Sequence, residues 1–250
     1  MATVADTIGA LAPFPDIDFS EFGEVEVKPL SRIQKLTGAF LGRNWVAIPH
    51  VTHHDEIDVT EAEERRRTFN ESNGVKVTPV VLLVKALARA LGEFPQFNSS
   101  LSADGNSLIY KKFTHVGVAV DTPNGLLVPV LRDCEGKGLA QIATELSAIA
   151  EKARTKGLAM QEMMGSSMSI SSLGHIGGTA FTPIVNSPDV AILGATAMQM
   201  RPAPADDGSV IWRKMLPLSL SYDHRVINGA DAARFVRALG VAMADPALIA

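Results

Sequence analysis

His224 is the residue of this chain best suited to proton transfer. It follows the segment Leu218–Tyr222, whose alternation of apolar and polar residues predicts a strand, and it precedes an Asn228-Gly229 pair. A histidine at a strand end has a rigid support, and its unperturbed pKa of roughly 6.5 suits acid–base chemistry near neutral pH. A structural histidine beside a hairpin turn is the simpler interpretation of these residues alone, because Asn-Gly is common in type I′ turns. The local residues leave both interpretations open.

A second candidate site is the segment 166–172, which contains five serines and precedes Gly174, Gly177 and Gly178. The alternation around Ser171 predicts a strand, and the glycines after it permit close backbone approach. A phosphate-binding loop would need a Gly-x-x-x-x-Gly-Lys pattern, which this segment lacks. The serines are therefore either ordinary strand residues or hydroxyl donors to a substrate.

The segment 223–229, Asp-His-Arg-Val-Ile-Asn-Gly, resembles the His-x-x-x-Asp-Gly signature of the chloramphenicol acetyltransferase-like superfamily. Within it, the match is to the catalytic domain of dihydrolipoyl acyltransferases, the cores of 2-oxoacid dehydrogenase complexes. Segments 29–35, 48–52, 169–174 and 181–186 agree with that family in the same order, so the resemblance runs from about Asp16 to the C-terminus. One departure is Asn228, which stands where most members have aspartate.

The resemblance implies acyl transfer between thiols, most like acetyl transfer from an S-acetyldihydrolipoyl group to coenzyme A in the pyruvate branch. His224 would accept the proton of the attacking thiol, and the Ser171 hydroxyl would stabilise the oxyanion of the tetrahedral intermediate. Asn228 would orient the turn around His224, since an amide carries no charge. Branched-chain or succinyl transfer, acetylation of an antibiotic hydroxyl, and a core protein without turnover stay open as alternatives.

The resemblance also places five residues at coenzyme A: Arg66, Thr78, Asp121, Ser172 and Gly194. Each of the first three has an ordinary explanation as well. Arg66 lies in a charged segment typical of a solvated helix face, Thr78 fits a helix N-cap before a proline, and Asp121 fits a turn. The sequence alone does not separate these roles from coenzyme binding.

Family members form homotrimers with active sites between subunits, and the trimers assemble into larger cores. By resemblance, His224 would come from one subunit and Ser171 from its neighbour. The lipoyl group would be carried on a separate domain. The 2-oxoacid decarboxylase and dihydrolipoyl dehydrogenase partners would bind through domains that this chain lacks.

Hydrophobic periodicity predicts an α/β fold with two layers, in which helices cover a mixed sheet. The resemblance implies that this fold is similar to that of chloramphenicol acetyltransferase. We expect an acyltransferase domain over residues 16–250, after a linker remnant or flexible arm over residues 1–15. The predicted helices cover residues 31–40, 80–91, 139–154 and 230–239, with a further helix starting near residue 60. The predicted strands cover residues 46–59, 107–110, 116–120, 126–131, 169–171, 182–185, 190–194 and 210–220.

Composition disfavours several classes of protein. A net charge of −4 and 6% aromatic residues argue against a nucleic-acid partner. No apolar run approaches the roughly 20 residues of a membrane span and the N-terminus has no secretory pattern, so we expect a soluble protein of the bacterial cytoplasm or, alternatively, the mitochondrial matrix.

Single residues that might suggest other chemistry have simpler explanations. Cys134 is the only cysteine, which excludes an internal disulfide, and we expect it to be wholly or partly buried. We expect no metal site at His53 and His54, because neighbouring strand residues point to opposite faces. Met160, Met163 and Met164 are interpreted as core or interface filler.

Overall fold

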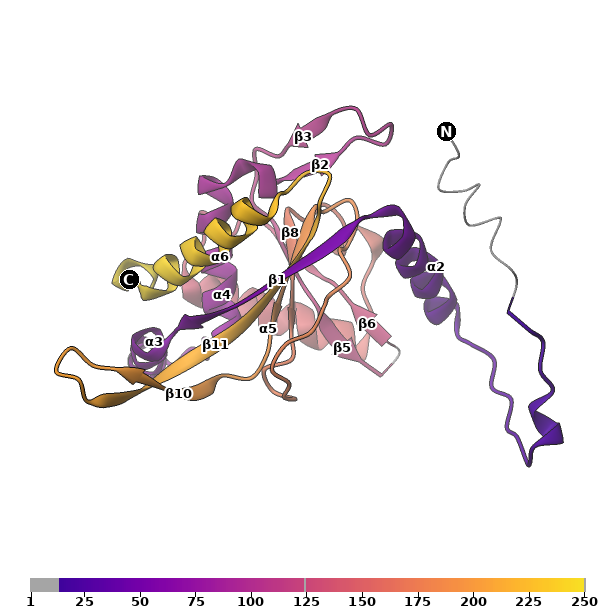
Figure 1. Cartoon of the computed structure of the whole chain (residues 1–250), viewed down its shortest axis with the longest axis horizontal. Coiled ribbons are helices and arrows are strands. Elements are labelled where there is room, and N and C mark those ends of the chain that lie inside the picture. Colours follow the sequence, from indigo (N-terminus) through magenta and orange to yellow (C-terminus); the bar gives the residue numbers. More distant parts are fainter. Residues whose placement is uncertain (1–13, 124, 250) are drawn as a thin grey trace.

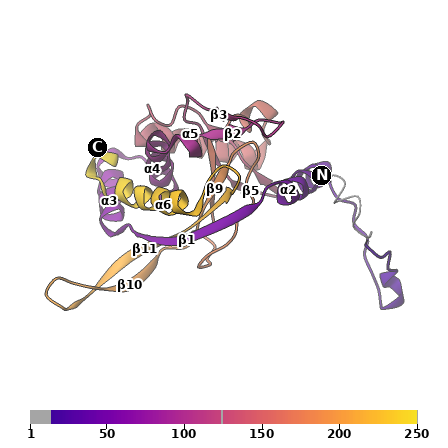
Figure 2. The same cartoon turned by 45° about the horizontal axis from the view of Figure 1, so that its top comes forward.

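The structure is a computed structural model that describes residues 14–123 and 125–249. Its centre is a seven-stranded mixed sheet in the order β1-β11-β9-β8-β4-β7, with β10 paired to β11 (Figures 1 and 2). Strand β8 is parallel to β4 and β9, and the remaining pairs are antiparallel. The strands of this sheet are β1 (His50–Asp58), β4 (Val116–Val118), β7 (Val130–Leu131), β8 (Met168–Ser172), β9 (Ala191–Ala195), β10 (Gln199–Pro204) and β11 (Val210–Asp223). Two hairpins stand beside it: β2 (Ser99–Leu101) with β3 (Leu108–Tyr110), and β5 (Val120–Thr122) with β6 (Gly125–Leu127).

Helices cover one face of the sheet and form the main core with it. They are α4 (Pro79–Glu93), α5 (Leu139–Thr155) and α6 (Gly229–Ala244), while α3 (Thr60–Asn73) lies at the end of the layer (Figure 1). Strand β11 shows why this face is apolar, because Leu216, Leu218 and Leu220 lie on alternate positions and all three are buried in the core. The predicted two-layer α/β architecture is confirmed.

The opposite face of the sheet is polar and lies under a long connection, residues 173–190. Ser169, Ser219 and Ser221 are buried there, and the Ser221 hydroxyl lies 2.8 Å from the hydroxyl of Thr52 on β1. A strand was predicted at 182–185 within this connection, and that prediction is wrong. The backbone groups of Val185 are hydrogen-bonded to side chains and not to a neighbouring strand. The Val185 N–H donates to His50 Nε2 at 3.0 Å, and the Val185 carbonyl accepts a hydrogen bond from Asn44 Nδ2, also at 3.0 Å.

Several element boundaries also differ from prediction. Helix α2 (Arg32–Ala47) continues beyond the predicted end at residue 40, so β1 starts at His50. The predicted strands 116–120 and 126–131 are each divided in two, because their halves pair in different sheets. Strand β10 was not predicted. Met160 and Met164 were interpreted as core or interface filler, but both are exposed. They are therefore not part of the core, and the interface role stays a prediction.

The segment from Phe14 to Ala47 stands apart from the body of the molecule (Figures 1 and 2). It contains α2, which starts with a capping box between Ser31 and Gln34, and of whose residues only Asn44 is buried. Phe14, Phe19 and Phe22 in the preceding arm are exposed. The predicted arm at residues 1–15 lies almost entirely outside the described residues. No helix among the described residues has the length and apolar character needed to cross a membrane.

Candidate active site

His224 lies directly after β11, where the chain turns back toward α6. Its backbone N–H donates to the Pro49 carbonyl at 3.1 Å, and the Asp223 carbonyl accepts the N–H groups of Val226 and Ile227, so the backbone of this turn is fixed. The imidazole is exposed and packs at a tilt on the Tyr222 ring, with 5.8 Å between ring centroids. Among the described residues neither ring nitrogen has a hydrogen-bond partner, so both are free to meet a substrate.

The Asp223 carboxylate acts on the turn and not on the histidine ring. It is buried and accepts hydrogen bonds from the backbone N–H, Nε and Nη2 of Arg225, the last at 2.6 Å. Such charge-assisted bonds are among the stronger ones in proteins. The hydrogen bonds between Asp223 and Arg225 hold the backbone around His224 rigid. The Asp223 carboxylate is not hydrogen-bonded to the His224 ring.

Asn228 is the N-cap of α6, and the hairpin-turn interpretation of Asn228-Gly229 is wrong. Its backbone is extended, with φ −96° and ψ 164°, and its amide oxygen accepts the Asp231 N–H at 3.0 Å. Gly229 is the first helical residue and does not have a positive φ. Asn228 therefore satisfies an end group of the helix that follows His224.

Ser171 and Ser172 are the last residues of β8 and point to opposite faces of the sheet. The register aligns Ser171 with Gly194 on β9, and Gly194 with Ser219 on β11, so the three share the polar face. A Cβ atom at Gly194 would lie 2.7 Å from the Phe181 ring, so this ring fills the space beside Ser171. Gly194 thus serves close packing in this structure.

One chain does not bring His224 and Ser171 together. They are separated by the residues from Ser219 to His224 along β11 and by two strand spacings across the sheet. At about 3.3 Å per residue and about 4.8 Å per strand spacing, this places them roughly 19 Å apart. A site that uses both residues needs a second copy of the chain.

Ser172 faces a cavity of about 560 Å³ on the other side of the sheet. Thr78 at the start of α4 also lines this cavity, so two of the predicted coenzyme residues lie together. Thr78 is the N-cap residue of α4, as predicted, but its hydroxyl makes no capping hydrogen bond with this helix. Most of the remaining wall is apolar and includes Val80, Leu83, Met198 and Leu216, whereas His175, which the sequence argument missed, adds a polar edge.

Arg66 and Asp121 do not line this cavity. The Arg66 guanidinium donates to both carboxylate oxygens of Glu63, at 2.8 and 2.9 Å, and to the Val77 carbonyl at 2.8 Å. The hydrogen bonds to Glu63 raise the pKa of Arg66 above its ordinary value. Asp121 is exposed in the middle of β5, where it pairs with Leu126, and is not the turn residue that was predicted.

Three further residues were considered from the sequence: Cys134, His53 and His54. Cys134 is buried as predicted, and burial raises the pKa of its thiol. His54 contacts the Ser219 hydroxyl at 2.9 Å, whereas the buried Nε2 of His53 has no hydrogen-bond partner among residues 14–123 and 125–249, in agreement with side chains on opposite faces. Within the described part of the chain, no group of three His, Cys, Asp or Glu residues is arranged to hold a metal ion.

The sequence matches the family described as 2-oxoacid dehydrogenases acyltransferase (catalytic domain) over residues 22–250. A relative from Pseudomonas aeruginosa, the dihydrolipoyllysine-residue acetyltransferase component of the pyruvate dehydrogenase complex, is 52% identical over 239 residues, which cover 94% of this chain and 43% of the relative. The chain thus spans less than half of the length of that protein.

Solved structures agree with this match. The dihydrolipoamide acetyltransferase of Azotobacter vinelandii, studied for the role of a serine, a histidine and an asparagine in its catalytic mechanism, is 50% identical with a TM-score of 0.91, over 96% of this chain and 100% of that one. The cubic core of a pyruvate dehydrogenase multienzyme complex gives the same values. Chloramphenicol acetyltransferase, 16% identical with a TM-score of 0.56 over 78% of this chain and 89% of that one, shares the fold.

Proposed function

Because the chain belongs to the family of 2-oxoacid dehydrogenase acyltransferases, whose catalytic domain it matches, we propose that it transfers an acetyl group between an S-acetyldihydrolipoyl group and coenzyme A. The observation that carries the proposal is the unpaired imidazole of His224 on a rigid strand end, four residues before Asn228. The histidine and asparagine studied in the Azotobacter vinelandii enzyme have the same spacing. The pyruvate-complex relatives favour acetyl over branched-chain or succinyl groups.

His224 accepts the proton of the coenzyme A thiol as its sulfur attacks the acetyl carbonyl carbon. A new carbon–sulfur bond forms, and the carbonyl oxygen becomes an oxyanion that the Ser171 hydroxyl stabilises by donating a hydrogen bond. When the intermediate collapses, the bond to the lipoyl sulfur breaks and His224 returns the proton to that sulfur. No covalent serine intermediate and no metal ion is required.

Coenzyme A is the acyl acceptor, and the cavity beside Ser172 and Thr78 supports an entry for its extended arm on that side of the sheet. Arg66 acts on this site through the Val77 carbonyl, which immediately precedes Thr78. Gly194 contributes by admitting Phe181 next to Ser171. Asp121 is proposed to contact the coenzyme from a neighbouring copy, since its own chain leaves it exposed.

We propose a homotrimer that assembles into a larger core, with His224 and Ser171 supplied by different subunits. The roughly 19 Å between them in one chain supports this arrangement. The exposed aromatic side chains of the arm, with Trp45 of α2, supply apolar surface for contact with a neighbouring copy. The lipoyl group and the decarboxylase and dehydrogenase partners would then reach the core through other domains.

The test is acetyl exchange between acetyl-coenzyme A and free dihydrolipoamide. We expect His224→Ala to lose at least about 10²-fold in kcat with little change in coenzyme A affinity, because only the proton acceptor is removed. Ser171→Ala and Ser172→Ala form a matched pair on the two faces of β8. Ser171→Ala should lower kcat, whereas Ser172→Ala should act mainly on KM. Near-normal turnover of His224→Ala, or transfer to an antibiotic hydroxyl in place of the thiol, would contradict the proposal.

A further inference from the structure

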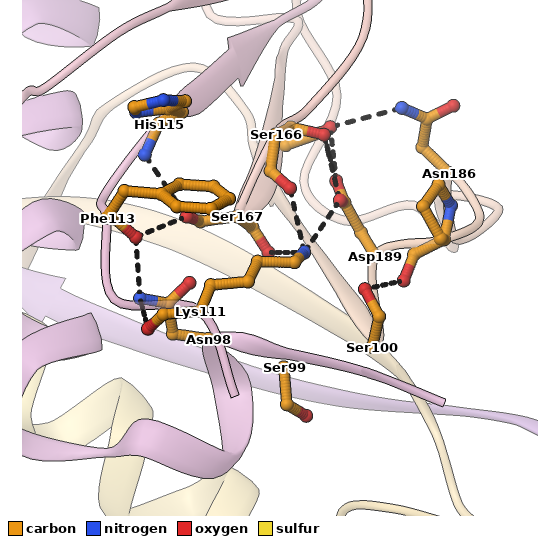
Figure 3. Close-up of polar contacts among 12 residues, drawn as sticks. Asn98, Ser99, Ser100, Lys111, Phe113, His115, Ser166, Ser167, Asn186 and Asp189 are labelled. Carbon is orange, nitrogen blue, oxygen red and sulfur yellow. Dashed lines mark hydrogen bonds and ion pairs between the residues drawn. The ribbon is translucent and has the colours of Figure 1, made fainter. Parts of the chain in front are cut away.

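A buried ion pair lies under the polar face of the sheet, near the start of β8 (Figure 3). Lys111 Nζ is 3.7 Å from Asp189 Oδ1, and the two side chains are 9% and 0% exposed. A charge removed from water in this way is retained only where it is paired and hydrogen-bonded. The pair is distinct from the residues of the proposed chemistry, so its position needs a separate explanation.

The Asp189 carboxylate holds two serines of the β8 region. Ser166 Oγ donates to it at 2.8 and 2.9 Å, and Ser169 Oγ donates to Oδ2 at 2.9 Å. Asn186 Nδ2 lies 3.4 Å from Ser169 Oγ and donates to it. Burial raises the pKa of Asp189, while Lys111 and the two hydroxyls oppose that shift. We call these five residues the Lys111–Asp189 network.

The network joins three segments that are far apart in the sequence. Lys111 follows β3, Asp189 lies near the end of the 173–190 connection, and Ser169 lies within β8. The Lys111 ammonium also donates to the backbone carbonyl of Ser166 at 2.8 Å. Both the backbone and the side chains at the start of β8 are therefore tied to the pair.

Ser169 and Ser171 point to the same face of β8, one alternation apart. A Cβ atom at Gly117 would lie 2.7 Å from Ser169 Oγ, so the hydroxyl occupies space left by a glycine on the neighbouring strand. The 173–190 connection also carries Phe181, whose ring packs over Gly194 beside Ser171. The network therefore holds both β8, which carries Ser171, and the 173–190 connection, which packs next to Ser171.

We propose that the Lys111–Asp189 network positions Ser171. The network holds Ser169 and the 173–190 connection in place, so that the Ser171 hydroxyl keeps its direction toward the reacting carbonyl. This inference rests on the proposed function, in which Ser171 donates to the oxyanion. A hydroxyl that loses its direction lowers the stabilisation of the transition state more than substrate binding, so the effect should appear in kcat and not in KM.

The experiment separates positioning from simple stabilisation. Lys111→Met or Asp189→Asn alone leaves one buried charge without its partner, so either is expected to unfold at lower denaturant concentration. The combined Lys111→Met/Asp189→Asn variant removes both charges, and its unfolding midpoint should return toward that of the parent. Its kcat for acetyl exchange should still be about tenfold below the parent, with KM within about twofold.

Ser169→Ala and Ser167→Ala provide a matched pair of single changes. Both serines are buried in or next to β8, but the Ser167 hydroxyl donates to the Phe113 carbonyl and does not contact Asp189. Ser169→Ala should lower kcat severalfold at unchanged KM, whereas Ser167→Ala should affect only the unfolding midpoint.

Ser171→Ala, measured in the same assay, tells the two proposals apart. If it keeps full kcat, the assignment of Ser171 fails and the network proposal fails with it. If Ser171→Ala loses kcat while Ser169→Ala and the combined variant keep it, only the network proposal is overturned.

Discussion

Co-assembly of two inactive variants gives the sharpest test of the active site. His224→Ala and Ser171→Ala chains with different affinity tags would be co-expressed, and assemblies that carry both tags would be isolated. The roughly 19 Å between the two residues in one chain far exceeds the hydrogen-bond reach that a shared reacting centre requires. If both residues act in the reaction as proposed, an intact site combines His224 of one copy with Ser171 of another.

The size of the expected signal follows from counting the sites. With equal amounts of both chains, a given site has an even chance of an unchanged histidine from one subunit and an even chance of an unchanged serine from its neighbour. About a quarter of the sites should be intact in a symmetric assembly with random mixing. If each variant alone retains about one hundredth of the parental kcat, the mixture should exceed either one by roughly 25-fold.

A matched mixture distinguishes the alternatives. Parental chains co-assembled with the double variant His224→Ala/Ser171→Ala should also keep about a quarter of the parental rate if the site is shared, but about half if each chain holds a whole site. Half activity in this mixture, together with none above background in the mixture of single variants, would refute the shared site.

Two further variants test single positions. Asn228→Asp should keep the α6 cap, because a carboxylate accepts the Asp231 N–H and suits a helix N-terminus, so most of kcat should be retained. Asn228→Ala removes the capping side chain and should lose about 1 kcal/mol of unfolding free energy. If a carboxylate at this position acted on His224, it would raise the histidine pKa and shift the acidic limb of kcat/KM upward, so a clear upward shift in Asn228→Asp would contradict the capping role. Gly194→Ala places a Cβ atom 2.7 Å from the Phe181 ring and should cost about 1–3 kcal/mol in a urea unfolding measurement, whereas unchanged stability would show that the ring can move away freely.

The local pattern of apolar and polar residues was sufficient to predict most helices and strand β11. The periodic apolar positions of α4 and the alternation of Leu216, Leu218 and Leu220 are buried as predicted, because each face of an element is set by residues a few positions apart. The same reasoning placed His224 after a strand. It failed for Asn228-Gly229, since one dipeptide suits both a hairpin turn and a helix start, and the residues that pack on α6 decide between them.

Tertiary structure alone decided which functional residues meet. No local signal shows that Val185 gives its backbone groups to His50 and Asn44, so a strand was predicted where none forms. The pairing of Lys111 with Asp189 and the separation of His224 from Ser171 likewise depend on strand order, which joins segments more than 50 residues apart. The sequence determined what each strand presents on its two faces, because that alternation is local. The order and register of the strands set the distance between His224 and Ser171, because many long-range contacts determine them together.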